Sequence, residues 1–361
     1  MGDRQDRPDA PVPALEPVTR AIPARLGSFT DERIADLERM DPALVPIGRQ
    51  IAGMVLSGGK RLRPAFVYWG FRAAGASDPH RPLVPGAAIE LLHTFALIHD
   101  DIMDRSPQRH GRPAVHVGLS RTHGDERLVS DPEWFGISGA ILAGDLASVW
   151  ADALFDTTDF PGGVEPDVRR VYTDLRVEVM AGQYLDLRLA GMADADEGYA
   201  TRVALLKSGR YSCTRPLLLG AALGGGSGAL ADALATYGDA AGLAFQLRDD
   251  VLGLFGDPEE TGKGVLEDLR EGKRTLLILR ARSLASGAAR HELDRMLGDA
   301  DVVDADAERA RQIVTDTGAL GQIESVLAHK LDAARTAIRD VPDPARAALA
   351  ELADYAVART R

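Results

Sequence analysis

The stretch LIHDDIMDRSPQRHGRP, residues 97–113, places three aspartates directly after an apolar run. If the run is helical, Asp100 and Asp104 lie on one face about 40° apart, whereas Asp101 points about 100° away. Two carboxylates one turn apart repel each other unless a cation lies between them. Mg²⁺ accepts carboxylate oxygens and fills its remaining positions with water and phosphate oxygens. The residues therefore predict a Mg²⁺ site at the end of a buried helix, with a solvated acidic helix end as the alternative.

A second acidic pair, Asp249 and Asp250, follows another apolar run much later in the chain. Gly253 stands where a third acid on the same helical face would lie, which weakens this pair as a self-contained metal site. The carboxylate of Asp249 can still complete a metal site that the first segment mainly forms. Asp257 and Asp268 lie further on, and ordinary turn and loop acids explain them equally well.

Basic residues alternate with these acids along the chain. The segment 58–64 places glycines beside Lys60 and Arg63, which project together if a helical turn starts there. Further cations are Arg109, His110, Lys207, Arg210, Lys263, Lys273 and Arg274. The chain has neither a Walker phosphate loop nor a Rossmann glycine fingerprint. The pattern predicts a clamp that binds a diphosphate partly through metal and partly directly, with solvated basic loops as the alternative.

The composition favours an all-α fold. Hydrophobic residues make up 45% of the 361 residues and aromatic residues only 5%, whereas strands prefer aromatic and β-branched residues. Apolar residues recur with helical spacing, and glycine and proline clusters separate the segments. We predict helices over residues 31–39, 42–56, 64–74, 85–104, 134–155, 168–189, 197–207, 213–223, 230–255, 273–286, 292–297, 305–317, 319–338 and 344–357.

Charge and terminal composition limit the classes of function. A net charge of −12 disfavours a general nucleic-acid-binding protein. Residues 1–25 contain five prolines and mixed charge, which predicts a flexible tail before a single helical domain over residues 26–361. The single cysteine, Cys213, excludes an intramolecular disulfide, and we recognise neither a signal peptide nor a membrane span. We therefore expect a cytoplasmic protein.

In this order, the motifs resemble those of the trans-isoprenyl diphosphate synthases, or polyprenyl synthetases, over about residues 50–280. The shared motifs are Gly58–Pro64, Leu92–Asp104, Arg109–Gly111, Gly144-Asp145, Gly182-Gln183 with Asp186, Lys207-Ser208, Phe245-Gln246 with Asp249-Asp250, and Gly262–Lys273. The resemblance implies a helix bundle around a central cavity, a homodimer and the use of Mg²⁺. The implied reaction adds an allylic diphosphate to isopentenyl diphosphate, head to tail.

The resemblance also implies a role for each matching residue. Asp100, Asp104 and Asp249 are expected to hold Mg²⁺, with Asp101 and Asp250 behind them. The allylic diphosphate is expected to contact Arg109, Lys207, Lys263 and Lys273, and isopentenyl diphosphate is expected to contact Lys60, Arg63, His93 and His110. Ser208 and Gln246 are expected to lend oxygens to the allylic cation, and Lys207 is expected to be catalytic with them through the diphosphate.

Three positions depart from the family pattern. His110 replaces the second arginine of an Arg-Arg pair, Ser208 replaces threonine, and Gly253 replaces the last acid of the second motif. Phe95 and Ala96 precede the first aspartate motif by five and four residues, a combination that resembles synthases of the twenty-carbon product. We therefore expect a geranylgeranyl diphosphate synthase, with Phe95 as the floor of the cavity and ordinary core packing as the alternative for this residue.

Other functions remain open at the level of sequence. The product can instead be farnesyl diphosphate or a longer polyprenyl diphosphate. Gly253 and His110 also fit a non-catalytic subunit that binds prenyl diphosphates. His93 and the pair His99-Asp100 resemble the metal ligands of all-α phosphohydrolases, but that hypothesis leaves the second acidic pair and the basic segment 58–64 unexplained.

Overall fold

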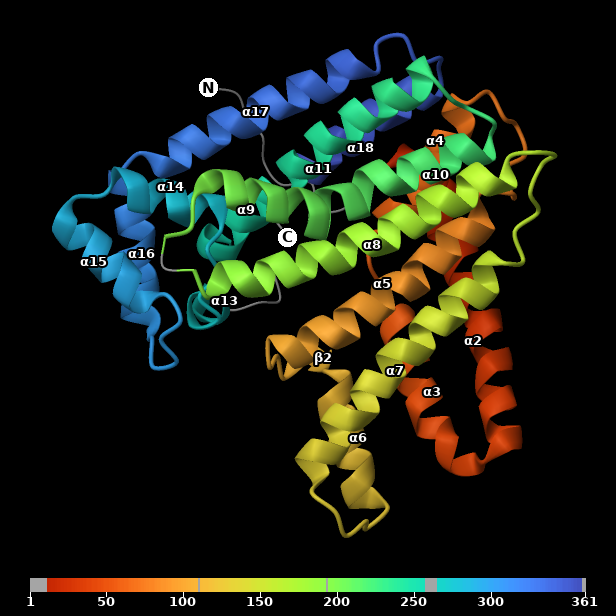
Figure 1. Cartoon of the computed structure of the whole chain (residues 1–361), viewed down its shortest axis with the longest axis horizontal. Helices are drawn as coiled ribbons and strands as arrows, with labels where there is room; N and C mark the ends of the chain where they lie inside the picture. Colours follow the sequence, from red (N-terminus) through yellow and green to blue (C-terminus); the bar gives the residue numbers. More distant parts are fainter. Residues whose placement is uncertain (1–11, 110, 193, 257–264, 359–361) are drawn as a thin grey trace.

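The computed structural model describes residues 12–109, 111–192, 194–256 and 265–358, and nearly all of their regular secondary structure is helical (Figure 1). The N-terminal half contains η1 (Pro13–Leu15), α1 (Glu16–Thr19), α2 (Ala21–Met40), η2 (Pro42–Leu44), α3 (Val45–Val55), α4 (Leu62–Ala73), α5 (Leu83–Met103), α6 (Val115–Asp125) and α7 (Pro132–Phe155). The C-terminal half contains α8 (Glu165–Ala190), α9 (Glu197–Val203), η3 (Ala204–Thr214), α10 (Arg215–Leu223), α11 (Ala229–Phe255), α13 (Val265–Arg270), α14 (Leu276–Leu284), α15 (Gly287–Met296), α16 (Asp304–Asp316), α17 (Ala319–Ala337) and α18 (Ala345–Val357). One short hairpin pairs β1 (Gln108–Arg109) with β2 (Arg112–Pro113) in antiparallel register. The all-α prediction is confirmed.

Two hydrophobic clusters form the core. The first is built mainly from α2, α4, α5, α7, α8, α10 and α18, and the second from α9, α14, α16 and α17. The long helix α11 belongs to both, because Tyr237 is buried in the first cluster and Leu247 in the second. Figure 1 shows α15 and α16 at one end of the molecule and α2 and α3 at the other. Helix α11 therefore connects the two halves of the core.

Helix α5 is apolar along most of its length because it is a core helix. Ile89, Leu91 and Leu92 are fully buried, and the helix packs against α4 and α7. It ends at Met103, with Asp104 as its C-cap, and Arg105 then takes a left-handed conformation (φ 54°). The predicted helix over residues 85–104 agrees with these bounds within two residues, so the aspartates do lie at the end of a buried helix.

The predicted flexible tail over residues 1–25 is too long. Residues 12–25 belong to the folded core, because Val18 and Ile22 are buried and Trp69 Nε1 donates a hydrogen bond to the carbonyl oxygen of Ala14 at 2.7 Å. Pro13 and Pro17 stand at the starts of short helices, where the missing backbone N–H is tolerated. Residues 1–11 lie outside the described residues.

Besides the short helices at residues 13–19, helices α6 and α13 were not predicted. Helix α6 buries Val115, Leu119 and His123, an apolar stripe that is narrow and contains a histidine. Helix α13 has only six residues, which is too short for periodicity to identify. Helices α9, η3 and α10 also run on continuously from Glu197 to Leu223, where two separate helices were expected.

Helix α7 is long and apolar enough to cross a membrane by length and composition alone, although no membrane span was predicted. This is weak evidence for a span, because the core helix of a soluble protein passes the same test. Helix α7 packs closely against α5 and α6, and Asp145 near its centre is exposed. A charge at that depth in a bilayer is costly. A cytoplasmic location remains a prediction.

Candidate active site

Asp100 lies in the last turn of α5 and accepts hydrogen bonds from three other elements. Gln183 Nε2, on α8, lies 2.9 Å from Oδ1 of Asp100, and Lys207 Nζ, on η3, lies 3.3 Å from the same oxygen. Arg109 Nη2, on β1, lies 3.3 Å from Oδ2. The side chain of Asp100 is only 16% exposed, so little water competes for these bonds. The structure thus places the first predicted aspartate where four elements meet.

Asp101 faces the interior, whereas the helical spacing predicts only that it points away from Asp100 and Asp104. It is fully buried, whereas Asp100 and Asp104 are partly exposed. Its Oδ1 accepts a hydrogen bond from Arg109 Nε at 2.8 Å and a second one from Arg109 Nη2. An arginine held at two nitrogens has a fixed orientation. Asp101 therefore positions Arg109 beside the other two aspartates.

Lys207 lies in η3, a π-helix that approaches α8 at a glycine. A Cβ added at Gly182 would lie 2.3 Å from the backbone nitrogen of Lys207, so this approach requires glycine. It brings Lys207 Nζ within 2.6 Å of Asp186 Oδ2 on α8, in addition to Asp100. Irregular helical turns of this kind are frequent at functional sites. The π-helix thus points a lysine at the aspartates of α5.

The charges in this cluster shift one another. Burial disfavours the ionised form of Asp100, but the positive charges of Lys207 and Arg109 lower its pKa overall. Burial likewise disfavours a charged Lys207, but Asp100 and Asp186 raise its pKa overall. Burial and the negative charge of Asp100 together raise the pKa of Asp104 to about 6. A further cation would therefore favour the ionised form of Asp104 more than that of the other carboxylates in this cluster.

A second group of residues lies around Tyr211, on η3. The Arg63 guanidinium lies 4.8 Å from the centre of the Tyr211 ring, and its Nη2 donates a hydrogen bond to Ser212 Oγ at 2.9 Å. The ring of His93, on α5, lies 5.9 Å from the same tyrosine ring. The structure therefore brings together two of the four residues predicted to contact isopentenyl diphosphate.

Lys60 lies in the loop before α4 rather than in its first turn. The helix begins at Leu62, and Arg61 precedes it in a left-handed conformation (φ 53°). Lys60 Nζ lies 5.5 Å from the ring centre of Tyr355, on α18, whereas Arg63 faces η3. Lys60 and Arg63 therefore do not lie in one helical turn. Arg61, which was not singled out from the sequence, instead forms a buried ion pair with Glu90.

The second acidic pair lies near the end of α11. Gln246 Nε2 donates a hydrogen bond to Asp250 Oδ1 at 2.8 Å, which leaves the amide oxygen of Gln246 outside this bond. Burial raises the pKa of Asp250 to about 7; the bond from Gln246 opposes this shift, and the charges of Asp249 and Asp268 add to it. Lys273 Nζ lies 3.0 Å from Asp268 Oδ1, and its charge favours the ionised forms of Asp100 and Asp104, although burial and the charge of Asp100 raise the pKa of Asp104 overall. Lys273 therefore acts on both acidic segments.

Phe95 and Ala96 are half-buried on α5, one turn above the aspartates. The ring of Phe95 packs edge-on against His99, with ring centres 4.9 Å apart, and contacts the first hydrophobic cluster. Ser208 follows Lys207 in η3 and is half-buried. His110 and Lys263, which were predicted to bind the two diphosphates, lie outside the described residues.

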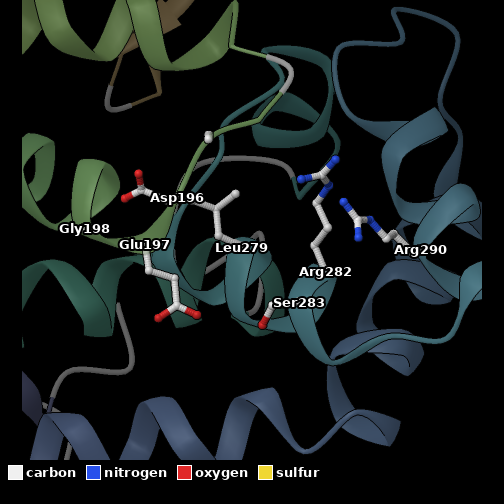
Figure 2. A pocket seen from close by; sticks show the side chains of 8 residues that line it. Asp196, Glu197, Gly198, Leu279, Arg282, Ser283 and Arg290 are labelled. Carbon is white, nitrogen blue, oxygen red and sulfur yellow. The ribbon is translucent and has the colours of Figure 1, made fainter.

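A pocket of about 600 Å³ lies away from these residues, between α9, α14 and α15 (Figure 2). Arg282 and Arg290 stand on one side of it, and Asp196 and Glu197 on the other. Its charges already have partners within the chain, since Arg282 Nε lies 2.5 Å from Asp294 Oδ1 and Glu197 pairs with an arginine of α14. None of the residues predicted for the site lines this pocket, so we do not assign it to the site.

A sequence model of the polyprenyl synthetase family matches residues 46–314, which include every predicted site residue. The chain belongs to the polyprenyl synthetase family. It is therefore a prenyltransferase of isoprenoid biosynthesis that acts on isoprenyl diphosphates. The resemblance inferred from the motifs is confirmed.

Relatives of this polyprenyl synthetase make products of different length. A geranylfarnesyl diphosphate synthase of Aeropyrum pernix is 34% identical over 315 residues, which are 85% of this chain and 92% of the relative. A geranylgeranyl diphosphate synthase of Methanosarcina mazei is 33% identical over 317 residues, 85% of this chain and 87% of the relative. A crystal structure of geranylgeranyl pyrophosphate synthase from Corynebacterium glutamicum, complexed with isoprenyl diphosphate and magnesium, superposes with a TM-score of 0.90 at 34% identity, covering 96% of this chain and 99% of that chain.

The donor set of this polyprenyl synthetase suits a hard divalent cation shared with a phosphate group. Within the described ranges, no three His, Cys, Asp or Glu side chains are close enough to bind a metal by themselves. Burial and the negative charge of Asp100 nevertheless raise the pKa of Asp104, so a cation beside the two carboxylates would be favourable. Two carboxylates that leave positions for water and phosphate oxygens are typical of Mg²⁺ sites. The residues present therefore fit Mg²⁺.

Several residues with contacts in the site were not given a role from the sequence. Gln183 and Asp186 were recognised as parts of a motif only, and Tyr211 and Ser212 were not singled out. Tyr211 lies four residues after Lys207, and helical spacing places both on one face. That spacing was the available signal for Tyr211.

Proposed function

We propose that this polyprenyl synthetase joins an allylic diphosphate to isopentenyl diphosphate, head to tail, and releases geranylgeranyl diphosphate as its main product. The observation that carries the proposal is the convergence of Lys207 and Arg109 on Asp100. Two cations, on η3 and β1, meet one carboxylate with low exposure. A diphosphate bound there would contact both cations directly and the carboxylates through metal.

The reaction begins with cleavage of the C–O bond of the allylic diphosphate, which leaves a diphosphate anion and an allylic cation. Lys207 and Arg109 stabilise the negative charge that develops on the diphosphate, and we assign the same role to Lys263 and Lys273. Asp100, Asp104 and Asp249 would hold Mg²⁺, which supplies further positive charge to the diphosphate oxygens when bound. The released diphosphate is placed to accept the final proton, so the chain needs no dedicated base.

The second substrate attacks the allylic cation through its double bond. Arg63 and His93, which lie around Tyr211, are assigned to the diphosphate of isopentenyl diphosphate, together with Lys60 and His110. The oxygens of Ser208 and Gln246 are assigned to the allylic cation. The hydrogen bond from Gln246 Nε2 to Asp250 supports this assignment, because it keeps the amide oxygen available.

The proposed chain length rests on Phe95. Its half-buried ring lies five residues before Asp100, which is about 7.5 Å along the helix axis. An aromatic ring at that depth limits how far a growing prenyl chain extends past the aspartates. The side chain of Ala96, one position closer to Asp100, is too small to block the growing prenyl chain. Farnesyl and longer products are the alternatives, since the relatives include both kinds of synthase.

We also propose that the protein acts as a homodimer. Helix α8 exposes Val177, Met180, Tyr184 and Leu187, which follow one another at helical spacing on one face. Helix α7 exposes large apolar side chains as well, among them Leu142 (62% exposed). Exposed apolar stripes of this kind indicate an interaction surface. We propose a second copy of the chain, rather than lipid, as the partner of this surface, because the charge of Asp145 on α7 would be costly in lipid.

Turnover assays test the function directly. Purified protein is incubated with Mg²⁺, labelled isopentenyl diphosphate and each allylic starter in turn, and the dephosphorylated alcohols are identified by length. A dominant geranylgeraniol peak is expected. A farnesol or longer peak would retain the reaction and reject the proposed product. No elongation with any starter would reject catalysis by this chain alone and would favour a non-catalytic subunit.

A further inference from the structure

His99 is a residue of α5 to which the proposed function assigns no role. It lies four residues after Phe95, so helical spacing places both side chains on one face. The side chain of His99 is 21% exposed, and the two rings pack edge-on, with centres 4.9 Å apart and planes at 70°. This is one of the favoured geometries of an aromatic pair. The ring that we assign to the cavity floor therefore rests against a second ring, beside Asp100.

A hydrogen bond to the backbone of α7 holds the imidazole ring of His99. Its Nε2 lies 3.0 Å from the carbonyl oxygen of Ile141. A carbonyl oxygen only accepts, so Nε2 carries a proton and donates it. The acceptor belongs to the backbone of a helix that packs closely against α5, so the bond does not depend on a second flexible side chain. The orientation of the imidazole ring is therefore fixed by the neighbouring helix.

Gly144, on α7, leaves the space that this ring fills. It belongs to a motif that the chain shares with its family and that the proposed function does not use. A Cβ added at Gly144 would lie 2.2 Å from Nε2 and 2.4 Å from Cδ2 of His99, closer than real Cβ contacts allow. A Cβ added at Gly139, on the same helix, would instead meet the flexible end of Leu119, 2.9 Å from its Cδ1. Any side chain at position 144 would therefore displace the imidazole ring.

We propose that His99 is a positioning residue for product length. Held by the carbonyl oxygen of Ile141 and by the space at Gly144, it keeps the ring of Phe95 where that ring stops the growing prenyl chain. This inference rests on the proposed function and deepens it, because it names the residues that fix the floor. Without the support of His99, the half-buried ring of Phe95 can turn to another rotamer. A longer prenyl chain then passes it.

Product ratios of the full-length protein test this role, because a ratio does not depend on how much of a variant is folded. In His99→Ala, the ratio of longer products to geranylgeranyl diphosphate is expected to rise about 2- to 10-fold, the effect of losing one aromatic contact. Gly144→Ala is expected to raise the ratio as well, since the methyl group displaces the imidazole ring from Ile141. The double variant should match His99→Ala alone, because Gly144 acts through His99.

Two matched variants measure a loss of stability alone. His123→Ala removes another histidine, whose Nε2 lies 3.0 Å from Ser130 Oγ and whose ring centre lies 5.2 Å from that of Phe135. Gly139→Ala crowds α7 away from His99. Both variants are expected to lower Tm and to leave the product ratio unchanged. A change of ratio in these controls equal to that in His99→Ala would overturn the inference.

The double variant His99→Ala/Phe95→Ala separates positioning from direct contact with the prenyl chain. It is expected to give the products of Phe95→Ala alone, because His99 acts through Phe95. Products longer than those of Phe95→Ala would show that His99 itself limits the chain, which would overturn the inference. A ratio in His99→Ala equal to that of wild type would overturn it too.

Binding gives a second measurement that does not require turnover. Isothermal titration calorimetry compares the affinities for geranylgeranyl diphosphate and for geranylfarnesyl diphosphate, which is one isoprene unit longer. Wild type is expected to bind the longer diphosphate more weakly, and His99→Ala is expected to reduce this difference about 2- to 10-fold. An unchanged difference would overturn the inference. Absence of elongation by wild type, with the binding results as expected, would reject the proposed function alone.

Discussion

The ammonium group of Lys207 lies 3.3 Å from a carboxylate oxygen of Asp100, although 107 residues separate the two in the chain. The contact depends on a π-helix that presses against α8 at Gly182. It joins the residue that we assign to the leaving diphosphate to the residue that we assign to the metal. The first prediction therefore concerns this pair.

Lys207→Met should weaken binding of inorganic pyrophosphate by about tenfold or more, since a charge-assisted bond to an anion contributes about 1.5 kcal/mol or more. Isothermal titration calorimetry in the presence of Mg²⁺ measures the effect. Lys330→Met, on α17 and outside the site, should bind pyrophosphate as wild type does. Equal affinities for both variants would show that Lys207 does not contact the diphosphate.

Phe95→Ala should lengthen the product, because removal of the ring opens the space beyond the aspartates. The variant is assayed with each allylic starter, and the alcohols are compared with those of wild type. Phe29→Ala removes a half-buried ring on α2 and should reduce stability without changing product length. An unchanged product distribution in Phe95→Ala would mean that Phe95 is ordinary core packing.

Arg61→Ala should destabilise the protein by about 3 kcal/mol or more, because it leaves Glu90 buried without its partner. Both side chains are only 7% exposed, and Arg61 Nη2 also donates to the carbonyl oxygen of Val55 at 2.8 Å. Urea denaturation measures the loss. The double variant Arg61→Met/Glu90→Leu should lose less, since it removes both charges. Arg39→Ala, in an exposed pair with Asp36, should lose less than about 1 kcal/mol.

Asp250→Asn should stabilise the protein at pH 8 and less so toward pH 5. Burial, to which the charges of Asp249 and Asp268 add, raises the pKa of Asp250 to about 7 from an ordinary value of 3.8. The folded protein therefore binds a proton that the unfolded chain releases, and this contribution to stability is complete below about pH 4 and is lost as pH rises through 7.

Asparagine keeps the oxygen that accepts the bond from Gln246 but cannot ionise. The full pKa difference corresponds to about 4 kcal/mol. We expect about 1–2 kcal/mol, since the side chain of Asp250 keeps partial contact with water. Urea denaturation in chelator at several pH values measures the difference, with Asp316→Asn as the control. A difference that does not vary with pH would contradict the assignment.

Leu142→Glu should convert the proposed dimer to a monomer, because it places a charge within the exposed apolar face of α7. Sedimentation velocity measures the mass. Val303→Glu changes an equally apolar side chain that is 55% exposed outside α7 and α8 and should leave the mass unchanged. A monomeric wild type would reject the proposed homodimer, and a dimeric Leu142→Glu would place the interface elsewhere.

Helical spacing was sufficient to predict that Asp100 and Asp104 share a face of α5 and that Asp101 lies on another, but it did not predict the burial of Asp101. The same reasoning could not predict that Asp101 binds Arg109, since the hairpin that returns Arg109 to α5 has only two paired residues in each strand. The hydrophobic pattern with a 3.6-residue period does not distinguish the π-helix at Lys207 from an α-helix. The close approach of Asp268 to Gly253 depends on a contact between two helices, which one sequence does not reveal.

The ion pairs of Asp100 and Asp268 also affect the conditions under which the protein folds. Each of these carboxylates already has a lysine partner on the same chain, so the polypeptide does not need a metal to offset their charge while it folds. Many small metal-binding domains, in contrast, are unfolded until the ion arrives. We expect this chain to reach its native state in chelator with little loss of Tm. The magnesium concentration in the cell would then determine the rate of the enzyme, but not the amount of folded enzyme.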